Sequence, residues 1–185
     1  MVYATFDHEM QATLRNMKND ILHSIEYLPE KIASHAAYGI LRIHLGTCDI
    51  DLINEQQPFP FYDGTEDMSC FACHKVNKGV PFQPAVISSK KTEILEVNET
   101  ITQVEIMNDV IHINHDEYTV SFDIALIIHT SHHVYMFARD VWFSEIISIR
   151  NDDDYERVFS MRNLVESWSN EGEENVEIDR TRTVL

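Results

Sequence analysis

Residues 118–126 alternate strictly between apolar and polar side chains, and this pattern constrains the fold more than any other feature of the sequence. The apolar members are Tyr118, Val120, Phe122, Ile124 and Leu126. A period of two is typical of a β-strand with one buried face. Similar short patterns occur at 97–106, 110–113, 134–138 and 143–149. The connections between these stretches are too short to hold a crossover helix, so they predict an antiparallel meander.

The middle of the chain predicts further strands and a long loop. Residues 37–53 alternate on both sides of a Gly46–Thr47 turn signal, which indicates two strands. Residues 69–76 are consistent with one short strand. Residues 54–68 contain Pro58, Pro60 and Gly64, so we expect a loop there. Residues 77–91 read as irregular for the same reason.

Two helices are expected to pack on this sheet. Apolar residues recur every three or four positions through 6–28 until Pro29, which predicts an N-terminal helix. A second helix is predicted over 154–168, after an acidic start. The predicted fold is therefore α+β, an antiparallel meander β-sheet packed by an N-terminal helix and a C-terminal helix.

The length of 185 residues and a hydrophobic content of 44% predict a single α+β domain. We place it at 1–170, with an internal break at 77–91 and an acidic, loosely ordered tail at 171–185. The first residues do not resemble a secretory signal, and the longest apolar run, 124–128, is far shorter than the ~20 residues of a membrane span. Three cysteines fit a reducing compartment, so we expect a cytoplasmic protein without a membrane partner.

Acidic residues dominate the charge of the chain. There are 31 Asp and Glu against 14 Lys and Arg, a net charge of −17. No Lys or Arg lies between Arg42 and Lys75, or between Lys91 and Arg139. Such a field repels nucleic acids and anionic lipids and attracts basic protein surfaces. A solubilising role alone would give the same composition.

The charge pattern leads to our main functional hypothesis, a non-catalytic protein that masks a basic surface of a partner. The partner would be a nuclease, another DNA-binding protein or a toxin. DNA-mimicking inhibitors of restriction and CRISPR nucleases use this strategy, and immunity proteins use a milder form of it. The expected partner-binding residues are Asp49, Asp51, Asp63, Glu66, Asp67, Asp152, Asp153 and Asp154.

Cysteine and histidine spacing supports an alternative, a zinc-stabilised module or a metal-dependent hydrolase. Four residues could form a closed zinc site if the chain folds back at Gly46. They are His44, Cys48, Cys70 and Cys73. With His74, the last two also match the C-x-x-C-H pattern of haem attachment. Buried free thiols would explain the same cysteines without any metal.

A hydrolase site could instead use the histidines near two turns together with neighbouring aspartates. The candidates are His112, His115, His129, His132 and His133, with Asp109, Asp116 or Asp123. No spacing among them matches a metalloenzyme motif, and no residue can be assigned a catalytic role. The main hypothesis needs no cofactor, whereas the alternative needs zinc.

Overall fold

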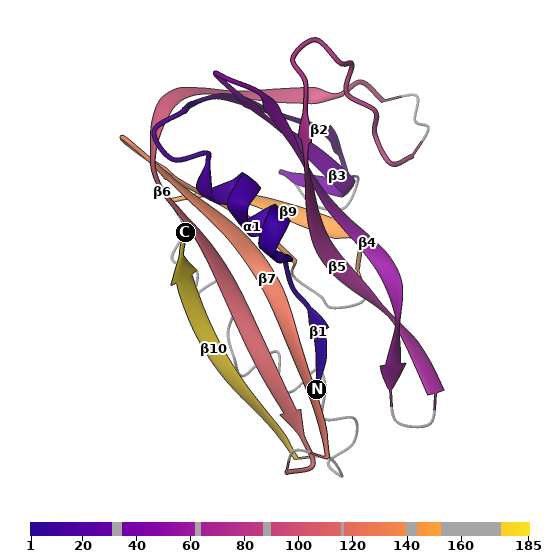
Figure 1. Ribbon diagram of the computed structural model, residues 1–185. Helices are drawn as coiled ribbons and strands as arrows, with labels where there is room; N and C mark the ends of the chain where they lie inside the picture. The colour runs from indigo at the N-terminus through magenta and orange to yellow at the C-terminus, as the bar shows by residue number, and fades with distance from the viewer. Residues whose placement is uncertain (31–34, 62–63, 87–89, 116, 140–143, 153–174) are drawn as a thin grey trace.

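The structure is a computed structural model that describes residues 1–30, 35–61, 64–86, 90–115, 117–139, 144–152 and 175–185. These residues form a ten-stranded sheet and one short helix, α1 (His8–Arg15), as Figure 1 shows. The strands are β1 (Val2–Ala4), β2 (Ile21–Pro29), β3 (Ala36–Leu45), β4 (Asp49–Phe61), β5 (Gly64–Val76), β6 (Glu93–Ile113), β7 (Tyr118–Thr130), β8 (Val134–Ala138), β9 (Ile146–Asn151) and β10 (Val176–Val184). No helix in this part of the chain has the length and apolar character that a membrane span requires.

Six of the strands pair into a closed ring. The order is β7, β8, β9, β3, β2 and β6, and β6 pairs again with β7. All of these pairs are antiparallel, as the short connections predict. The sheet is nevertheless not a simple meander, because β9 returns to β3 and β6 returns to β2. One buried cluster draws side chains from all six strands and from α1, so the ring has a continuous apolar core.

Two long arms extend from this ring (Figure 1). The first, the β6–β7 arm, carries β10 along β6 and the short parallel strand β1 along β7. The second, the β4–β5 arm, is a two-stranded ribbon attached to β3. A second buried cluster joins the arms and contains Met68 and Cys70 of β5 with Val120 and Phe122 of β7. The Tyr118 hydroxyl also donates a hydrogen bond to the Pro60 carbonyl across the arms.

A buried arginine lies where the arms meet. Arg139 is 1% exposed, and its guanidinium lies 5.6 Å from the Phe71 ring centroid and 5.0 Å from that of Phe122. Its Nη1 donates to the Ser69 carbonyl of β5. Burial lowers the pKa of Arg139 to about 10, although the charge of Asp123 opposes this change. Because Phe71 and Phe122 belong to different arms, this side chain fixes their relative position.

The predicted α+β fold is wrong, because the described chain is mostly β-sheet with one short helix. The expected helix over 6–28 is limited to the eight residues of α1, and β2 follows it. Asn19 has a left-handed φ of 70°, which ends the helical path before β2. Within β2 the exposed Ile21 and His23 alternate with buried neighbours, as a strand requires. The expected C-terminal helix over 154–168 lies outside the described residues.

Two further segments form β-strands where the sequence predicted irregular structure. Residues 54–61 and 64–68, expected to be mostly loop, belong to the paired strands β4 and β5 and form the outer half of that arm. Pro58 and Pro60 are accommodated because β4 has no second neighbour beyond Ile53, so a missing N–H can face the open edge. The tail expected to be loosely ordered contains β10, which pairs with β6 along nine residues.

Several other strand predictions are confirmed, whereas the stretches at 97–106 and 110–113, expected to be separate, form one strand, β6. The alternating residues 118–126 lie in β7, and 134–138 form β8. The two strands expected within 37–53 are β3 and the start of β4, and residues 69–76 belong to β5. The described residues between β5 and β6 contain neither helix nor strand.

We predict that Asp109→Asn lowers the free energy of unfolding by about 3 kcal/mol. Asp109 is fully buried on β6 and accepts hydrogen bonds of 2.7 and 2.8 Å from Arg180 of β10. The change leaves a buried guanidinium without its counter-charge. Urea unfolding measures the effect, and Thr181→Ala, an exposed change on the same strand, should stay within about 0.5 kcal/mol of the wild type. Equal midpoints for Asp109→Asn and the wild type would contradict this role.

Candidate functional site

The first pair of predicted partner-binding acids lies inside an internal charge network. The β3–β4 register places Arg42 opposite Asp51 and His44 opposite Asp49. Arg42 donates to both carboxylate oxygens of Asp51, at 2.7 and 3.0 Å. Lys78 Nζ lies 2.8 Å from Asp49 Oδ1, and His44 Nδ1 lies 3.1 Å from the same oxygen. Both acids are therefore neutralised by the protein itself.

The segment after β5 covers this network. The Val80 carbonyl accepts a hydrogen bond of 2.5 Å from Arg42, whose guanidinium lies 5.5 Å from the Phe82 ring centroid. Asp49 is 3% exposed. Asp49 and Asp51 do occupy one face of β4, as expected from the strand period, but Asp49 is buried and the Asp51 side chain is only 15% exposed. This corrects the expectation that Asp49 and Asp51 lie on an exposed acidic surface.

Carboxylates on β6 are paired in the same way. Glu105 is 2% exposed, and its Oε2 lies 2.7 Å from Arg182 Nε of β10. Its Oε1 lies 2.8 Å from His129 Nε2 of β7. Burial on its own would raise the pKa of Glu105, but hydrogen bonds from Arg182 and Gln103 outweigh it and lower that pKa. Asp109 is paired with Arg180, as described above. The body of the sheet thus compensates its own acids.

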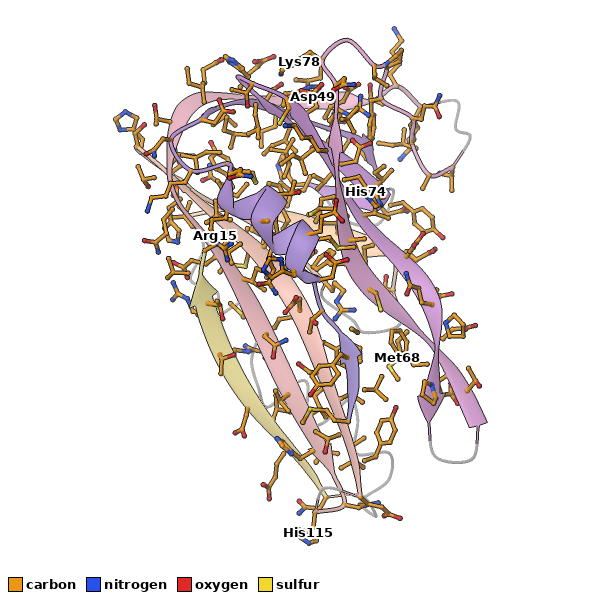
Figure 2. All side chains as sticks on the ribbon, viewed as in Figure 1. Arg15, Asp49, Met68, His74, Lys78 and His115 are labelled. Atoms are coloured by element: carbon orange, nitrogen blue, oxygen red, sulfur yellow. The ribbon has the colours of Figure 1, made fainter. Side chains whose placement is uncertain are left out.

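Several exposed acids lie toward the far ends of the two arms, while others, such as Glu93 and Glu96, are exposed elsewhere. We name the surface at the ends of the arms the acidic end. Its members are Glu66 and Asp67 of β5, Glu117 directly before β7, and Glu177 and Asp179 of β10. Asp179 has a side chain that is 81% exposed. Figure 2 labels His115 at the end of the β6–β7 arm and Met68 between the two arms. The contact between Tyr118 and Pro60 links one arm to the other close to these acids.

The remaining predicted acids do not belong to the acidic end. Asp152 is exposed, but it lies after β9 and accepts a 2.8 Å hydrogen bond from the backbone N–H of Val134. Asp63, Asp153 and Asp154 lie outside the described residues. Of the eight predicted acids, the structure therefore places Glu66 and Asp67 on the exposed surface proposed here. Glu177 and Asp179 belong to the acidic tail that the sequence also suggested as part of the binding surface, but the strand was missed, although the alternation of Val176 and Ile178 with these acids is a strand signal.

The predicted zinc ligands are dispersed. His44 is held between Glu26 and Asp49, at 3.1 Å from each. Cys48 and Cys73 belong to the core of the ring, whereas Cys70 belongs to the cluster between the arms. Cys70 and Cys73 are three residues apart on one strand, so their side chains leave it on opposite faces. In the chain as described, no three His, Cys, Asp or Glu side chains are placed to hold a metal ion together.

The predicted hydrolase histidines are also separated. His129 lies beside Glu105, and His133 Nδ1 lies 2.6 Å from Glu99 Oε1, both at the hairpin end of β7. His112 and His115 lie at the other end of β7, by the turn from β6. These two line a pocket of about 330 Å³ together with three residues of the last segment. The three are Asn175, Glu177 and Asp179.

A second cleft of about 340 Å³ lies between α1 and β5. Asp7 and Glu9 of the first turn face Cys73, His74 and Lys75 across it. The Asp7 side chain accepts a hydrogen bond from the Met10 N–H and caps the helix. The nearby charges are of both signs, so the cleft does not favour a ligand of one charge.

Comparison of the chain with protein-family models, with curated proteins and with solved structures finds no match in any of the three.

We predict that Cys70 and Cys73 resist alkylation by iodoacetamide in the native protein. Burial raises the pKa of the Cys70 thiol to about 11 and that of Cys73 to about 12. At about pH 8 the thiolate fraction is then at least about 100-fold below that of a free thiol. Mass spectrometry after timed labelling measures the rates, with urea-unfolded protein as the control. Labelling of the native thiols as fast as the unfolded ones would contradict their burial.

Proposed function

We propose that this chain is a non-catalytic binding protein whose acidic end holds a basic surface of a partner protein. The observation that supports the proposal is the difference between buried acids, which have charged partners, and exposed acids at the ends of the arms. Asp49, Glu105 and Asp109 are buried in the body and are paired with Arg, Lys or His, whereas Glu66, Asp67 and Glu117 are exposed at the ends of the arms. The stretches that build the arms between Arg42 and Lys75 and between Lys91 and Arg139 contain no Lys or Arg.

The sign and spacing of these charges favour a protein partner that itself binds nucleic acid. A net charge of −17 repels phosphate backbones, so direct binding to DNA or RNA is disfavoured. Glu177 and Asp179 lie two apart on one strand, so they point to the same side about 6.6–6.8 Å from each other. An array of anions on an ordered sheet is suited to a groove lined with Lys and Arg. A nuclease or another DNA-binding protein offers such a groove.

The zinc-dependent alternative is not proposed, because its cysteines have no common ligand position. Cys70 and Cys73 point to opposite faces of β5, and His44 is already held by two carboxylates. Binding by an acidic surface therefore remains the function that the geometry supports best.

We predict that neutralising the acidic end weakens binding to a cationic peptide. The probe is a fluorescent peptide of about twelve alternating Arg and Gly residues, followed by fluorescence anisotropy at low salt. The double variant Glu66→Gln/Asp67→Asn should weaken binding about tenfold, which corresponds to the loss of two exposed charge contacts. Raising the salt to about 0.5 M should abolish most of the wild-type binding.

The matched control is Glu93→Gln/Glu96→Gln, which removes two exposed acids from the start of β6, away from the ends of the arms. It should change affinity less than about twofold. If both double variants weaken binding equally, only net charge matters and the proposed surface is wrong. Binding that persists at high salt would also contradict an electrostatic contact.

A further inference from the structure

The imidazole ring of His44 lies between two carboxylates that come from the strands on either side of it. Its Nε2 lies 3.1 Å from Glu26 Oε2 of β2, and its Nδ1 lies 3.1 Å from Asp49 Oδ1 of β4. An ionised carboxylate only accepts hydrogen bonds, and a neutral imidazole has a proton on one nitrogen alone. The imidazolium ion has protons on both nitrogens, so it is the form of His44 that can donate to both carboxylates at once.

We propose that His44 forms a pH-dependent bridge that joins β2, β3 and β4 when its ring is protonated. We name these three side chains the His44 bridge. As an imidazolium, the ring donates one hydrogen bond to each neighbouring strand. As a neutral ring it keeps one of these bonds, and its other nitrogen presents a lone pair to a carboxylate oxygen. Both forms use the side-chain positions as they stand, so the bridge requires no rearrangement of the sheet.

The charges around His44 favour the protonated ring. Besides His44, the cluster has three carboxylates and two basic groups, namely Glu26, Asp49, Asp51, Arg42 and Lys78. An imidazolium makes the numbers of positive and negative charges equal. The hydrogen bond to Asp51 raises the pKa of Arg42 although burial lowers it, and the charges of Asp49 and Glu26 contribute to the increase. The same two carboxylates contact the His44 ring, so they stabilise a positive charge there as well.

Other contacts hold the two carboxylates of the bridge in place. Glu26 Oε1 accepts a 3.0 Å hydrogen bond from the Thr92 hydroxyl, and Asp49 Oδ1 lies 2.8 Å from Lys78 Nζ. The His44 and Glu26 side chains are 23% and 20% exposed, so water and salt screen the bridge only in part. Two further titratable groups of the described chain lie farther along this face. They are Glu96 of β6, in the row of Ser24 and His44, and His74 of β5, opposite Asp51.

The bridge stabilises the fold at mildly acidic pH, and its contribution is lost as the pH rises. Unfolding separates His44 from both carboxylates, so the folded chain favours the proton more than the unfolded chain does. The loss falls in the range where imidazole ordinarily titrates, about pH 5 to 8, above the range where carboxylates take up protons. The pairs His129–Glu105 and His133–Glu99 act in the same direction, so the effect of His44 must be isolated with variants.

Urea unfolding of the full chain at pH 6 and at pH 8 tests the bridge. We expect His44→Gln to raise the unfolding equilibrium constant about tenfold at pH 6 and less than about threefold at pH 8, because the charge that it removes is present mainly at the lower pH. The matched control is His23→Gln on β2, where the ring Nδ1 lies 3.2 Å from the uncharged amide oxygen of Asn98. Its effect should be the same at both pH values. Equal destabilisation by His44→Gln at pH 6 and pH 8 would overturn the proposal.

Nitrogen-15 NMR of the histidine rings gives a second test that does not depend on the folding of a His44 variant. At pH 7 a larger fraction of His44 than of His23 should have protons on both ring nitrogens. Glu26→Gln, which removes one carboxylate and keeps the shape of the side chain, should reduce this difference. The proposal is wrong if the two rings of the wild type are protonated to the same extent, or if Glu26→Gln leaves the difference unchanged.

Discussion

The buried guanidinium of Arg139 fixes the geometry on which the rest of the structure depends. It contacts an aromatic ring of each arm and a backbone carbonyl of β5, in a place where water cannot reach it. Burying a cation is unfavourable unless nearby groups compensate, and here two π faces, the Ser69 carbonyl and the charges of Asp123 and Asp109 offset part of the cost of burial. Because these partners come from different strands, the arms can satisfy Arg139 only when they lie together.

The pairing of interior acids with Arg and Lys also determines which acids stay exposed without a basic partner of their own. Arg180 and Arg182 of β10 pair with the buried carboxylates of β6. Arg42 pairs with β4, and Lys78 comes from the segment that covers it. These four bases belong to the 14 Lys and Arg of the chain and neutralise acids of the interior, and are not free to neutralise acids at the ends of the arms. The acidic end is therefore a consequence of how the protein stabilises its interior.

Local sequence predicted the strands with regular alternation but not their partners. The period of two identified residues 118–126 correctly, because one buried face imposes it. The apolar spacing of residues 6–28 fits a helix, so the sequence predicted one long helix there. In the structure the left-handed Asn19 ends the helical segment, and β2 pairs with β3 and β6 instead. Residues 54–68 contain turn formers, yet 54–61 of β4 pair with 64–71 of β5. Such long-range pairing overrides local propensity.

The candidate surface was only partly predictable for the same reason. Composition identified the two stretches without Lys or Arg, and both contribute to the acidic end. It could not show that Asp49 and Asp51 face internal bases, since Arg42 and Lys78 reach them through strand register and chain folding. Nor could it show that the tail supplies both the arginines that neutralise β6 and the acids beside His112.

Carboxyl labelling of the native protein tests most directly which acids are buried and which are exposed. Carbodiimide coupling to an amine, followed by mass spectrometry of the peptides, gives a rate for each acid. The account predicts rapid modification of the acidic end and protection of Asp49, Glu105 and Asp109, which are 3%, 2% and 0% exposed. Modification of these three at the rate of Glu66 and Asp67 would contradict it.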